Sequence, residues 1–338
     1  MVNMEQKIKS YFEKLNPNKL GLKSKIKVKS ISKLGQGTSH LNYLVKINTS
    51  KFIFRFNSDL KNNNLSKQEF KHLKLIEKYK IGPKAYLFDD SRKFFDSDFI
   101  IIGYLEGKTV KLVKPYLDNK MVESLARLSA KMHSINISKL NLNKDETNFN
   151  SYFKYITIYL RYIKKHLPNR ELLLILDQTY KNLRRVKIIN YNSKLVLTQG
   201  DFNENNVVVN KGKYKLIDFE DLKLTDPAAE IAHIFTFFGK PFNTIQRKIF
   251  LEEYSKFRKD ESLEDRIKMY LPLKRFKVLL WSIFHVLKIK NQELHKKFLE
   301  KNDLNEDIKF VGISFKRCLE HRVIDMEYNK FDILGLFK

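Results

Sequence analysis

The sequence predicts an α+β protein of two lobes, a small β-rich N-lobe followed by a larger, mainly helical C-lobe. Two observations lead to this fold class. Most segments before residue 106 alternate apolar and polar residues as strands do, whereas most later segments repeat their apolar residues at helical spacing. No linker rich in glycine, serine or proline divides the chain. We therefore expect a bilobed architecture with lobes at 1–103 and 104–338.

The N-lobe is expected to hold a first helix, an antiparallel sheet and a second helix. Ser66 is the expected N-cap of the second helix, Glu69 completes a capping box with it, and Gly82-Pro83 ends the helix. A glycine-containing turn (GQGTSH) joins the first two strands. The expected elements are a helix at 4–15, strands at 26–34, 41–47 and 51–56, a helix at 66–80, and strands at 84–88 and 98–105.

The C-lobe is expected to be helical apart from one hairpin, in which VVVN and YKLID are joined by a Lys-Gly turn. A cleft between two such lobes is a natural place for a ligand. The expected helices cover 119–136, 150–166, 170–186, 226–239, 243–259 and 266–300.

The charge balance is strongly basic, at +27, and two explanations stay open. A basic surface would suit nucleic acid, an anionic membrane or a phosphorylated ligand. However, 52 of the 65 basic residues are lysines scattered along the chain, which is typical of a general compositional bias. Because no motif combines aromatic and basic residues as RNA-binding proteins do, nucleic acid is not the favoured partner.

The compartment is predicted to be the cytoplasm. The single cysteine, Cys318, cannot form an internal disulfide, which favours a reducing setting. The charged N-terminus lacks the apolar region of a signal peptide. The longest apolar stretches, such as 278–287, are shorter than the roughly 20 residues that span a bilayer, so no membrane span is expected.

A polar run at 197–209 (LTQGDFNENNVVV) stands directly before three valines. A polar hairpin turn is the simple explanation. Alternatively, the next strand brings Asp218 close to Asn206, so that these two residues offer oxygen ligands to Mg²⁺ and a nucleotide. Asp201, five positions before Asn206, would then face the hydroxyl group that accepts a phosphoryl group from ATP.

The N-lobe supplies candidates for contact with the phosphates. Arg55 on the third strand, held by Glu69 fourteen residues later, would lie over them, although an exposed arginine is the alternative. The turn between the first two strands could bring backbone N–H groups to the phosphate oxygens, although hairpins also commonly use glycine. Its candidate residues are Gly35, Gly37, Thr38 and Ser39.

These motifs resemble a known family. QGDFNENN and LIDFEDLKLTDPAAEIA resemble the H-G-D-x-x-x-x-N and I-D-[WF]-E-x-x-x-x-x-D-P-x-x-[DE]-[IL]-A motifs of the aminoglycoside phosphotransferase / choline kinase superfamily. The similarity runs from about residue 30 to 300 and is dense only at 199–232. It implies a protein-kinase-like fold, with Asp201 as the catalytic base and Asn206 and Asp218 as Mg²⁺ ligands.

The resemblance implies further roles in the nucleotide-binding lobe. Arg55 occupies the position that contacts phosphate, and Glu69 occupies the position of its ion-pair partner. The backbone of Gly103 and Leu105 would contact adenine. A departure from the family pattern that matters for activity is Gln199, which stands where the family usually has histidine. Because a glutamine amide both donates and accepts hydrogen bonds, it can still orient the loop.

A small-molecule hydroxyl is the favoured acceptor, because only seven residues separate Asp218 from Asp226 and no peptide-docking segment fits between them. LLWSIFHVLKIK at 279–290 resembles the choline/ethanolamine kinase helix whose rings enclose an ammonium group, which makes Trp281 a candidate. Trp281 as an ordinary core residue is the alternative. Glu220 is a candidate for an acidic patch beside the acceptor.

The sequence therefore predicts an ATP- and Mg²⁺-dependent phosphotransferase acting on the hydroxyl of an amino-alcohol or an aminoglycoside-like compound. Two alternatives stay open. The first is a nucleotide-binding pseudokinase, which the replacement of the usual histidine by Gln199 suggests. The second is an RNA-associated kinase-like protein, which the net charge of +27 suggests. The sequence does not determine the oligomeric state.

Overall fold

The computed structural model describes residues 4–34, 40–57, 65–113, 116–138, 142, 149–167, 169–185, 193–237, 242–291 and 304–324. They belong to two compact units. The first comprises Met1–Leu128 and Gln199–Leu222, and the second comprises Ser129–Thr198 and Lys223–Lys338. The predicted α+β class is confirmed, since the first unit contains an antiparallel sheet and the second is mostly helical. The lobe boundary at residues 103 and 104 stays a prediction.

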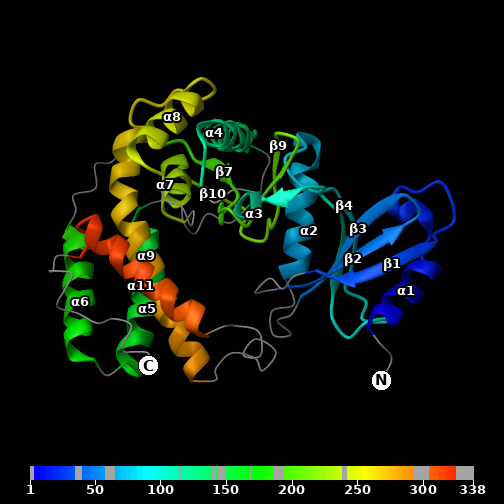
Figure 1. Cartoon of the computed structure of the whole chain (residues 1–338), viewed down its shortest axis with the longest axis horizontal. Helices are drawn as coiled ribbons and strands as arrows, with labels where there is room; N and C mark the ends of the chain where they lie inside the picture. The colour runs from blue at the N-terminus through cyan, green and yellow to red at the C-terminus, as the bar shows by residue number, and fades with distance from the viewer. Residues whose placement is uncertain are drawn as a thin grey trace. The chain divides into compact units, whose positions relative to one another are not determined.

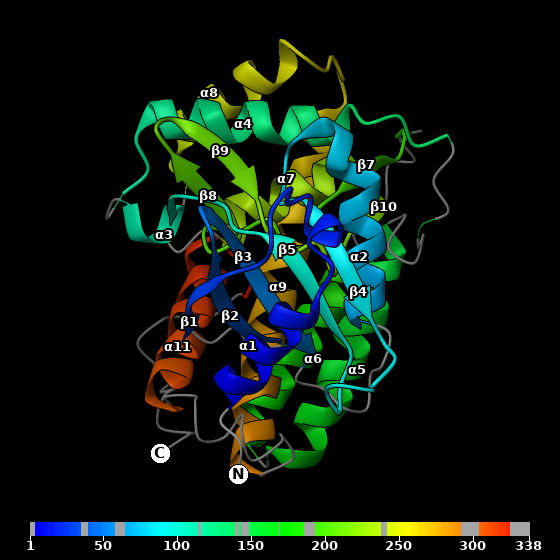
Figure 2. The ribbon, with the colours of Figure 1, turned by 90° about the vertical axis from the view of Figure 1, so that its right-hand side faces the viewer.

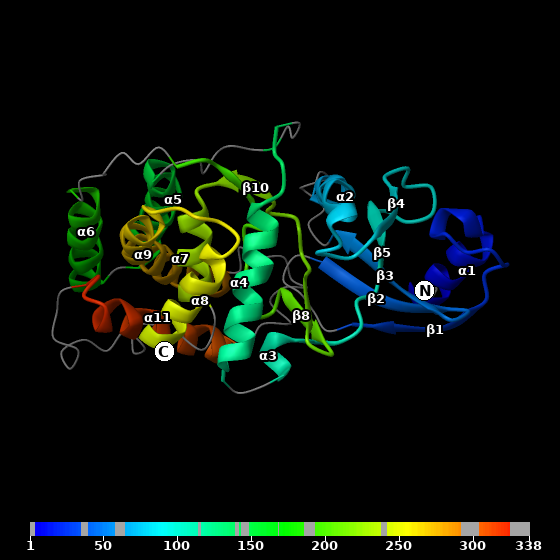
Figure 3. The same cartoon turned by 90° about the horizontal axis from the view of Figure 1, so that it is seen from above.

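The first unit is built on a five-stranded antiparallel sheet in the order β1-β2-β3-β5-β4 (Figure 3; Figure 1 labels all of these strands but β5). Helix α1, Met4–Lys14, packs against one face of this sheet (Figure 2). Its Ile8 and Phe12 join Phe54 and Phe99 in one apolar core. The strands are β1 Val28–Lys33, β2 His40–Ile47, β3 Ser50–Asn57, β4 Ala85–Asp89 and β5 Phe99–Gly103, and a 3-10 turn covers Pro17–Leu20.

Helix α2, Leu65–Ile76, contacts β3, β4 and β5 and continues as a 3-10 turn, Glu77–Tyr79. The predicted capping box is wrong: Ser66 lies within the helix, and its buried hydroxyl forms no hydrogen bond in the part of the chain described. The reason is that Ser66 and Glu69 share a buried face, where the Glu69 carboxylate meets an arginine instead. Lys80, in the left-handed conformation (φ 54°), closes the turn before Gly82.

The predicted hairpin is confirmed as β8, Val207–Asn210, and β9, Lys213–Leu216. Its turn residues Lys211 and Gly212 both have positive φ (46° and 73°), as a tight hairpin turn requires. A third strand, β6 at Lys108–Thr109, pairs with β8 and leads into α3, Val110–Val113. Strands β7, Val196–Thr198, and β10, Lys223–Thr225, pair in the second unit. These three short strands were not predicted, because two or three residues show no periodicity.

Helix α9, Leu263–Lys290, is the central helix of the second unit and packs against α5, α7 and α11 (Figures 1 and 3). Part of the predicted 266–300 helix lies outside the described residues, and α11 was not predicted. No helix in the described ranges is long and apolar enough to cross a membrane. The remaining helices are α4 Asn119–His133, a 3-10 turn at Phe149–Ser151, α5 Tyr152–His166, α6 Arg170–Arg185, α7 Pro227–Phe237, α8 Thr244–Ser255 and α11 Leu304–Glu320.

The start of α7 follows its local chemistry. The Asp226 carboxylate accepts a hydrogen bond from the backbone N–H of Ala228 (2.9 Å), and Pro227 opens the helix, as predicted. The same carboxylate binds the Nε of Arg266 (2.9 Å), a residue of α9. This buried contact fixes the N-terminus of α7 against the central helix.

Candidate active site

Asp201 lies in the loop before β8, where two asparagine side chains orient it. The Nδ2 of Asn206 donates to the Asp201 Oδ2 (2.9 Å) and backbone carbonyl (3.0 Å). The Nδ2 of Asn203 donates to the same carboxylate oxygen (2.8 Å). The two hydrogen bonds to one carboxylate oxygen hold the side chain in a single orientation. Asn203 was not a predicted site residue, although it belongs to the polar run.

Gln199 connects this loop to the segment that follows β9. Its fully buried amide nitrogen donates to the carbonyl groups of Ile217 (3.1 Å) and Asp218 (2.5 Å). Its amide oxygen accepts the backbone N–H of Asp201 (2.8 Å). Gln199 thus both donates and accepts, so it holds Asp201 and Asp218 in a fixed relation.

Asp218 follows β9 directly and adopts a positive φ of 64°. The preceding Ile217 N–H donates to the carbonyl of Asn206 (2.9 Å), so the predicted approach of Asn206 and Asp218 is present. Burial raises the pKa of Asp218 to about 6, despite the opposing charge of Arg55. A left-handed aspartate whose carboxylate is costly to ionise is typical of a functional site.

Gly200 makes the close approach of the two loops possible. Its φ is 92°, and a Cβ at this position would lie 2.2 Å from the backbone oxygen of Asp221. Gly212 also has a positive φ, of 73°, but no atom lies within 4 Å of the position of its Cβ.

We therefore expect Gly200→Ala to destabilise the fold far more than Gly212→Ala. The Gly212 substitution should cost about 1–2 kcal/mol, the cost of a left-handed alanine. At Gly200 the steric clash should bring the total above about 3 kcal/mol. Urea unfolding of both variants measures the difference, and equal losses of stability would contradict the close packing described here.

Arg55 is buried with 8% of its surface exposed, so the alternative of an exposed arginine is wrong. It lies on the face of β3 opposite Phe54, as strand alternation predicts. Its Nη1 contacts the Glu69 carboxylate at 2.5 Å and the Asp218 carboxylate at 3.5 Å, while its Nε donates to the Asn42 side chain (2.9 Å). The predicted Arg55–Glu69 contact is therefore present, and it extends to Asp218.

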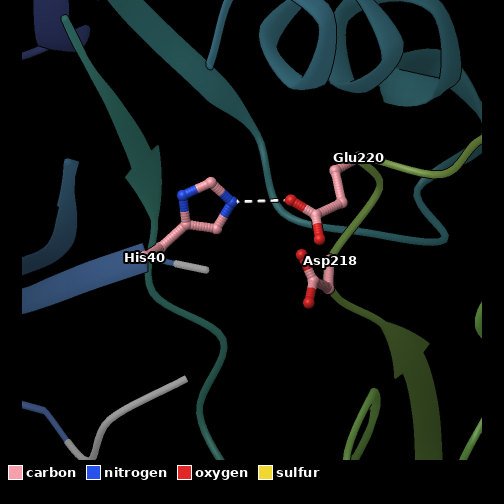
Figure 4. A group of neighbouring side chains, drawn as sticks. All are labelled: His40, Asp218 and Glu220. Atoms are coloured by element: carbon pink, nitrogen blue, oxygen red, sulfur yellow. Dashed lines mark hydrogen bonds and ion pairs between the residues drawn. The ribbon is translucent and has the colours of Figure 1, made fainter. Parts of the chain in front are cut away.

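A further side chain, His40 on β2, joins the group (Figure 4). Its Nε2 lies 2.8 Å from the Oε2 of Glu220, 180 positions away in the sequence. Potential ligand atoms of His40, Asp218 and Glu220 all lie within 4.8 Å of one another. Figure 4 shows both carboxylates on the same side of the imidazole ring. No spacing rule in the sequence could have found His40, because the contact arises only from the tertiary fold.

The charges of this cluster act on Glu220 as well. Burial acts to raise its pKa, but the hydrogen bond and charge of His40 outweigh burial, and the pKa lies below its usual value. Glu220 is therefore ionised at neutral pH. Its carboxylate and that of Asp218 offer hard oxygen atoms close to each other, which suits a divalent cation.

The remaining predicted residues are placed as follows. The glycine-turn candidates Gly35, Gly37, Thr38 and Ser39 lie outside the described residues. Gly103 ends β5 and donates its N–H to the carbonyl of Lys84 (2.8 Å). The Leu105 N–H makes no backbone hydrogen bond within the described ranges. The adenine contacts of Gly103 and Leu105 stay a prediction.

Trp281 belongs to the second unit, whereas Glu220 belongs to the first. Its ring stacks on His285 (centroids 5.2 Å apart, planes at 12°) and meets Phe310 of α11 edge-on (6.3 Å). With 37% of its surface exposed, Trp281 is not an ordinary core residue, so that alternative is wrong. Its contact with a substrate stays a prediction.

One family model and several solved structures are similar to this chain. The sequence profile of the phosphotransferase enzyme family (APH) matches residues 30–270. None of the curated proteins matches the chain in sequence.

Solved structures share the fold at low sequence identity, in agreement with the predicted protein-kinase-like architecture. Choline kinase from Cryptosporidium parvum is similar with a TM-score of 0.63 and 17% identity, over 94% of this chain and 97% of that chain. A choline/ethanolamine kinase family protein from Mesorhizobium loti has a TM-score of 0.64 and 13% identity, over 99% of both chains. APH(2")-IIa, in a ternary complex with streptomycin and ATP, has a TM-score of 0.62 and 17% identity, over 94% and 97%.

Proposed function

Because the chain belongs to the phosphotransferase enzyme family, we propose that it moves the γ-phosphate of ATP to the hydroxyl group of a small molecule. The observation that carries this proposal is the link between two loops. Gln199 joins the loop of Asp201 and Asn206 to Asp218, so a proton acceptor and candidate metal ligands belong to one rigid group. Phosphoryl transfer needs little more from a protein than such positioning and charge.

Mg²⁺ is the proposed cation. Asn206 and Asp218 would hold it through oxygen atoms, and Glu220 lies close enough to Asp218 to take part. When bound, the ion would neutralise charge on the phosphates. His40 would orient the Glu220 carboxylate through its 2.8 Å contact.

Arg55 would bind phosphate oxygens from the N-terminal side of the site. Its Nη1 already lies between the Glu69 and Asp218 carboxylates, so its position is fixed before a nucleotide binds. The Gly103 carbonyl and the Leu105 N–H would meet the adenine edge, and the 35–39 turn would cover the phosphates. A preset guanidinium reduces the entropy that is lost on binding.

Asp201 would act as the base in the transfer itself. The acceptor oxygen forms a bond to the γ-phosphorus while the bond from that phosphorus to the bridging β–γ oxygen breaks, leaving ADP. The acceptor proton passes to the Asp201 carboxylate, whose Oδ2 is held by Asn203 and Asn206. This orientation is what a general base requires.

The acceptor is proposed to be an amino-alcohol or an aminoglycoside-like compound. Structural neighbours named as choline kinase and as an APH(2")-IIa complex with streptomycin support this range. We propose that Glu220 supplies negative charge beside the acceptor. As a separate proposal, Trp281 offers an aromatic face to an ammonium group. The buried Cys318 fits a working place in the reducing cytoplasm.

The test is phosphate transfer from radiolabelled ATP with Mg²⁺ to a panel of amino-alcohols, aminoglycosides, thiamine and sugars. Transfer to at least one hydroxyl compound supports the proposal. Tight Mg–ATP binding without transfer to any compound would instead favour a nucleotide-binding pseudokinase.

Metal binding should depend on pH through Asp218. Its pKa of about 6 in the folded chain means that protons compete with the metal below that value. We expect the affinity for Mg²⁺, measured by calorimetry, to fall roughly tenfold per pH unit below about pH 6. Affinity that is constant between about pH 5 and about pH 7 would contradict a role for this carboxylate.

The stability of the metal-free protein should show the opposite trend. Because the folded pKa lies above the model value of 3.8, protonation of Asp218 stabilises the fold fully below about pH 3.8, and this contribution is lost as the pH rises through about 6. Urea unfolding with and without Mg²⁺ should therefore diverge most above about pH 6.

A further inference from the structure

His72 connects helix α2 to the segment that follows β9. It lies three residues after Glu69, so the two side chains share one face of the helix. Glu69 binds Arg55, whereas the Nδ1 of His72 lies 2.6 Å from the carbonyl oxygen of Phe219. Only 5% of the His72 surface is exposed. The hydrogen bond is therefore shielded from water, and it joins residues 147 positions apart in the sequence.

The direction of this hydrogen bond follows from its acceptor. A carbonyl oxygen can only accept, so the Nδ1 of His72 carries the hydrogen and donates it to Phe219. Burial lowers the pKa of His72 below its usual value, which keeps the ring neutral at neutral pH. A neutral imidazole has one N–H group, and in His72 it is therefore the Nδ1 that bears the hydrogen.

The Phe219 carbonyl belongs to the peptide group that leads into Glu220. Because a peptide group is planar, the orientation of this carbonyl sets the direction in which the Glu220 side chain leaves the backbone. Gln199 holds the two preceding carbonyl groups, at 3.1 Å and 2.5 Å. Gln199 and His72 together thus hold three consecutive carbonyl groups, and the one directly before Glu220 is held by His72.

The other contacts of Phe219 fix its ring more than its carbonyl. The ring is fully buried, and a Cβ on Gly82 would lie 2.6 Å from its Cε2, so the ring rests directly against the Gly82 backbone. The Leu222 N–H also approaches the Phe219 carbonyl oxygen, but at 3.4 Å. A contact of that length is weak, so His72 supplies the main hydrogen bond to this oxygen.

Glu220 meets two site residues from this position. Its Oε2 lies 2.8 Å from the Nε2 of His40, and its carboxylate lies beside that of Asp218 (Figure 4). Two carboxylates can bind one ion only when their oxygen atoms stay close together. A rotation of the peptide group before Glu220 would move its carboxylate away from Asp218.

We propose that His72 is a positioning residue of the metal site, which keeps the Glu220 carboxylate beside Asp218 by holding the Phe219 carbonyl. The inference rests on the proposed function, in which both carboxylates face Mg²⁺. His72 acts on the ion only through the backbone. Loss of a group that orients a metal ligand in this way typically weakens metal binding by about 10- to 100-fold.

The first test determines which nitrogen of His72 bears the hydrogen. NMR of the isotope-labelled imidazole ring distinguishes the two neutral forms, because a protonated and an unprotonated ring nitrogen resonate far apart. We expect the hydrogen on Nδ1 at neutral pH. A hydrogen on Nε2 instead would exclude the hydrogen bond to the Phe219 carbonyl and would overturn the proposal.

The second test separates the hydrogen bond from the loss of the ring. Asparagine places an amide nitrogen at the same number of bonds from the backbone as the His72 Nδ1, so His72→Asn can still donate to Phe219. Leucine has a similar shape but no donor. In calorimetry with Mg²⁺, His72→Leu should bind the ion about 10- to 100-fold more weakly than the parent protein, and His72→Asn should stay within about threefold of the parent.

Equal affinity for Mg²⁺ in His72→Leu and the parent protein would overturn the proposal. His72→Gln is a second variant for the case in which His72→Leu does not fold. Its amide nitrogen lies one bond further from the backbone than the His72 Nδ1, so it should weaken Mg²⁺ binding as leucine does.

A double-mutant cycle tests whether His72 acts through Glu220. Glu220→Gln should also weaken Mg²⁺ binding, and adding His72→Leu to it should cause little further loss, because the carboxylate that His72 positions is already absent. Losses of binding free energy that simply add would show that His72 acts independently of Glu220, and would overturn the proposal. An unchanged affinity in Glu220→Gln would overturn it as well.

His133→Leu is the matched control for a general loss of stability. His133 is a buried histidine of the second unit, with its ring nitrogens 2.8 Å from the Tyr254 hydroxyl and 2.7 Å from the Glu230 carboxylate. This variant should lose at least as much stability in urea as His72→Leu, yet keep the Mg²⁺ affinity of the parent protein. If both variants lose affinity to the same extent, destabilisation alone explains the effect and the proposal fails.

The same calorimetry distinguishes this inference from the proposed function. If the parent protein binds no Mg²⁺, the proposed function fails at its metal site, and the role of His72 fails with it. If the parent protein and His72→Leu bind Mg²⁺ equally well, only the role of His72 fails.

Discussion

Asp201→Asn is expected to reduce turnover by about 10²- to 10⁴-fold while leaving the affinity for Mg–nucleotide within about twofold. Asparagine retains an oxygen that can accept the hydrogen bonds of Asn203 and Asn206, so the loop should keep its conformation. It cannot accept the proton of the attacking hydroxyl. The predicted loss is therefore in kcat, because the base acts only once the reacting groups are in place.

Turnover can be measured with an acceptor from the panel or as slow hydrolysis of ATP, since a water molecule needs the same base. Calorimetry with Mg–ADP gives the nucleotide affinity. The matched control is Asp90→Asn, which removes an equal charge at an exposed position paired with Lys67 (3.9 Å). If Asp201→Asn instead loses nucleotide affinity in proportion to turnover, Asp201 serves binding and the base is a different group.

Glu69→Gln is expected to destabilise the fold by about 3–5 kcal/mol and to weaken nucleotide binding at least tenfold. Arg55 and Glu69 form a buried pair with side chains 10% and 1% exposed. Removing the carboxylate leaves the guanidinium buried with Asp218 as its remaining acidic contact, at 3.5 Å. Arg55 should then move toward Asp218, away from the place where we propose that it meets phosphate.

Urea unfolding measures the loss of stability, and Arg55→Met, Glu69→Met and the variant with both substitutions form a double-mutant cycle. Because the pair is lost together, the double variant should be less destabilised than the sum of the two single variants. Glu106→Gln is the control, since it breaks the exposed Lys51–Glu106 pair (2.6 Å) and should cost less than about 1 kcal/mol. Equal losses of unfolding free energy for Glu69→Gln and Glu106→Gln would show that the buried pair stabilises the fold no more than the exposed pair does.

The strands and the hairpin could be predicted because their signals are local. Alternation along β3 placed Arg55 opposite Phe54, and the Lys211-Gly212 turn fixed the hairpin that brings Asn206 to Asp218. The family resemblance carried by these loops agrees with the profile match over 30–270. Local signals were enough to predict the class of the fold and most elements of the sheet.

Other features depend on contacts between distant segments and could not be read locally. His40 meets Glu220 across 180 positions, and no spacing rule connects them. The buried face of α2 carries two polar residues, Ser66 and Glu69. The sequence pattern assigned both to a helix cap. It could not reveal their burial, because Arg55, the partner of Glu69, lies on a separate strand.

The most direct measurement is a crystal structure of the protein with Mg²⁺ and a non-hydrolysable ATP analogue. We predict one cation with the Asp218 carboxylate and the Asn206 amide oxygen within about 2.1 Å, and Asp201 turned toward the γ-phosphate. An ion bound away from both residues, or a triphosphate that does not approach Asp201, would contradict the assignment of these loops to phosphoryl transfer.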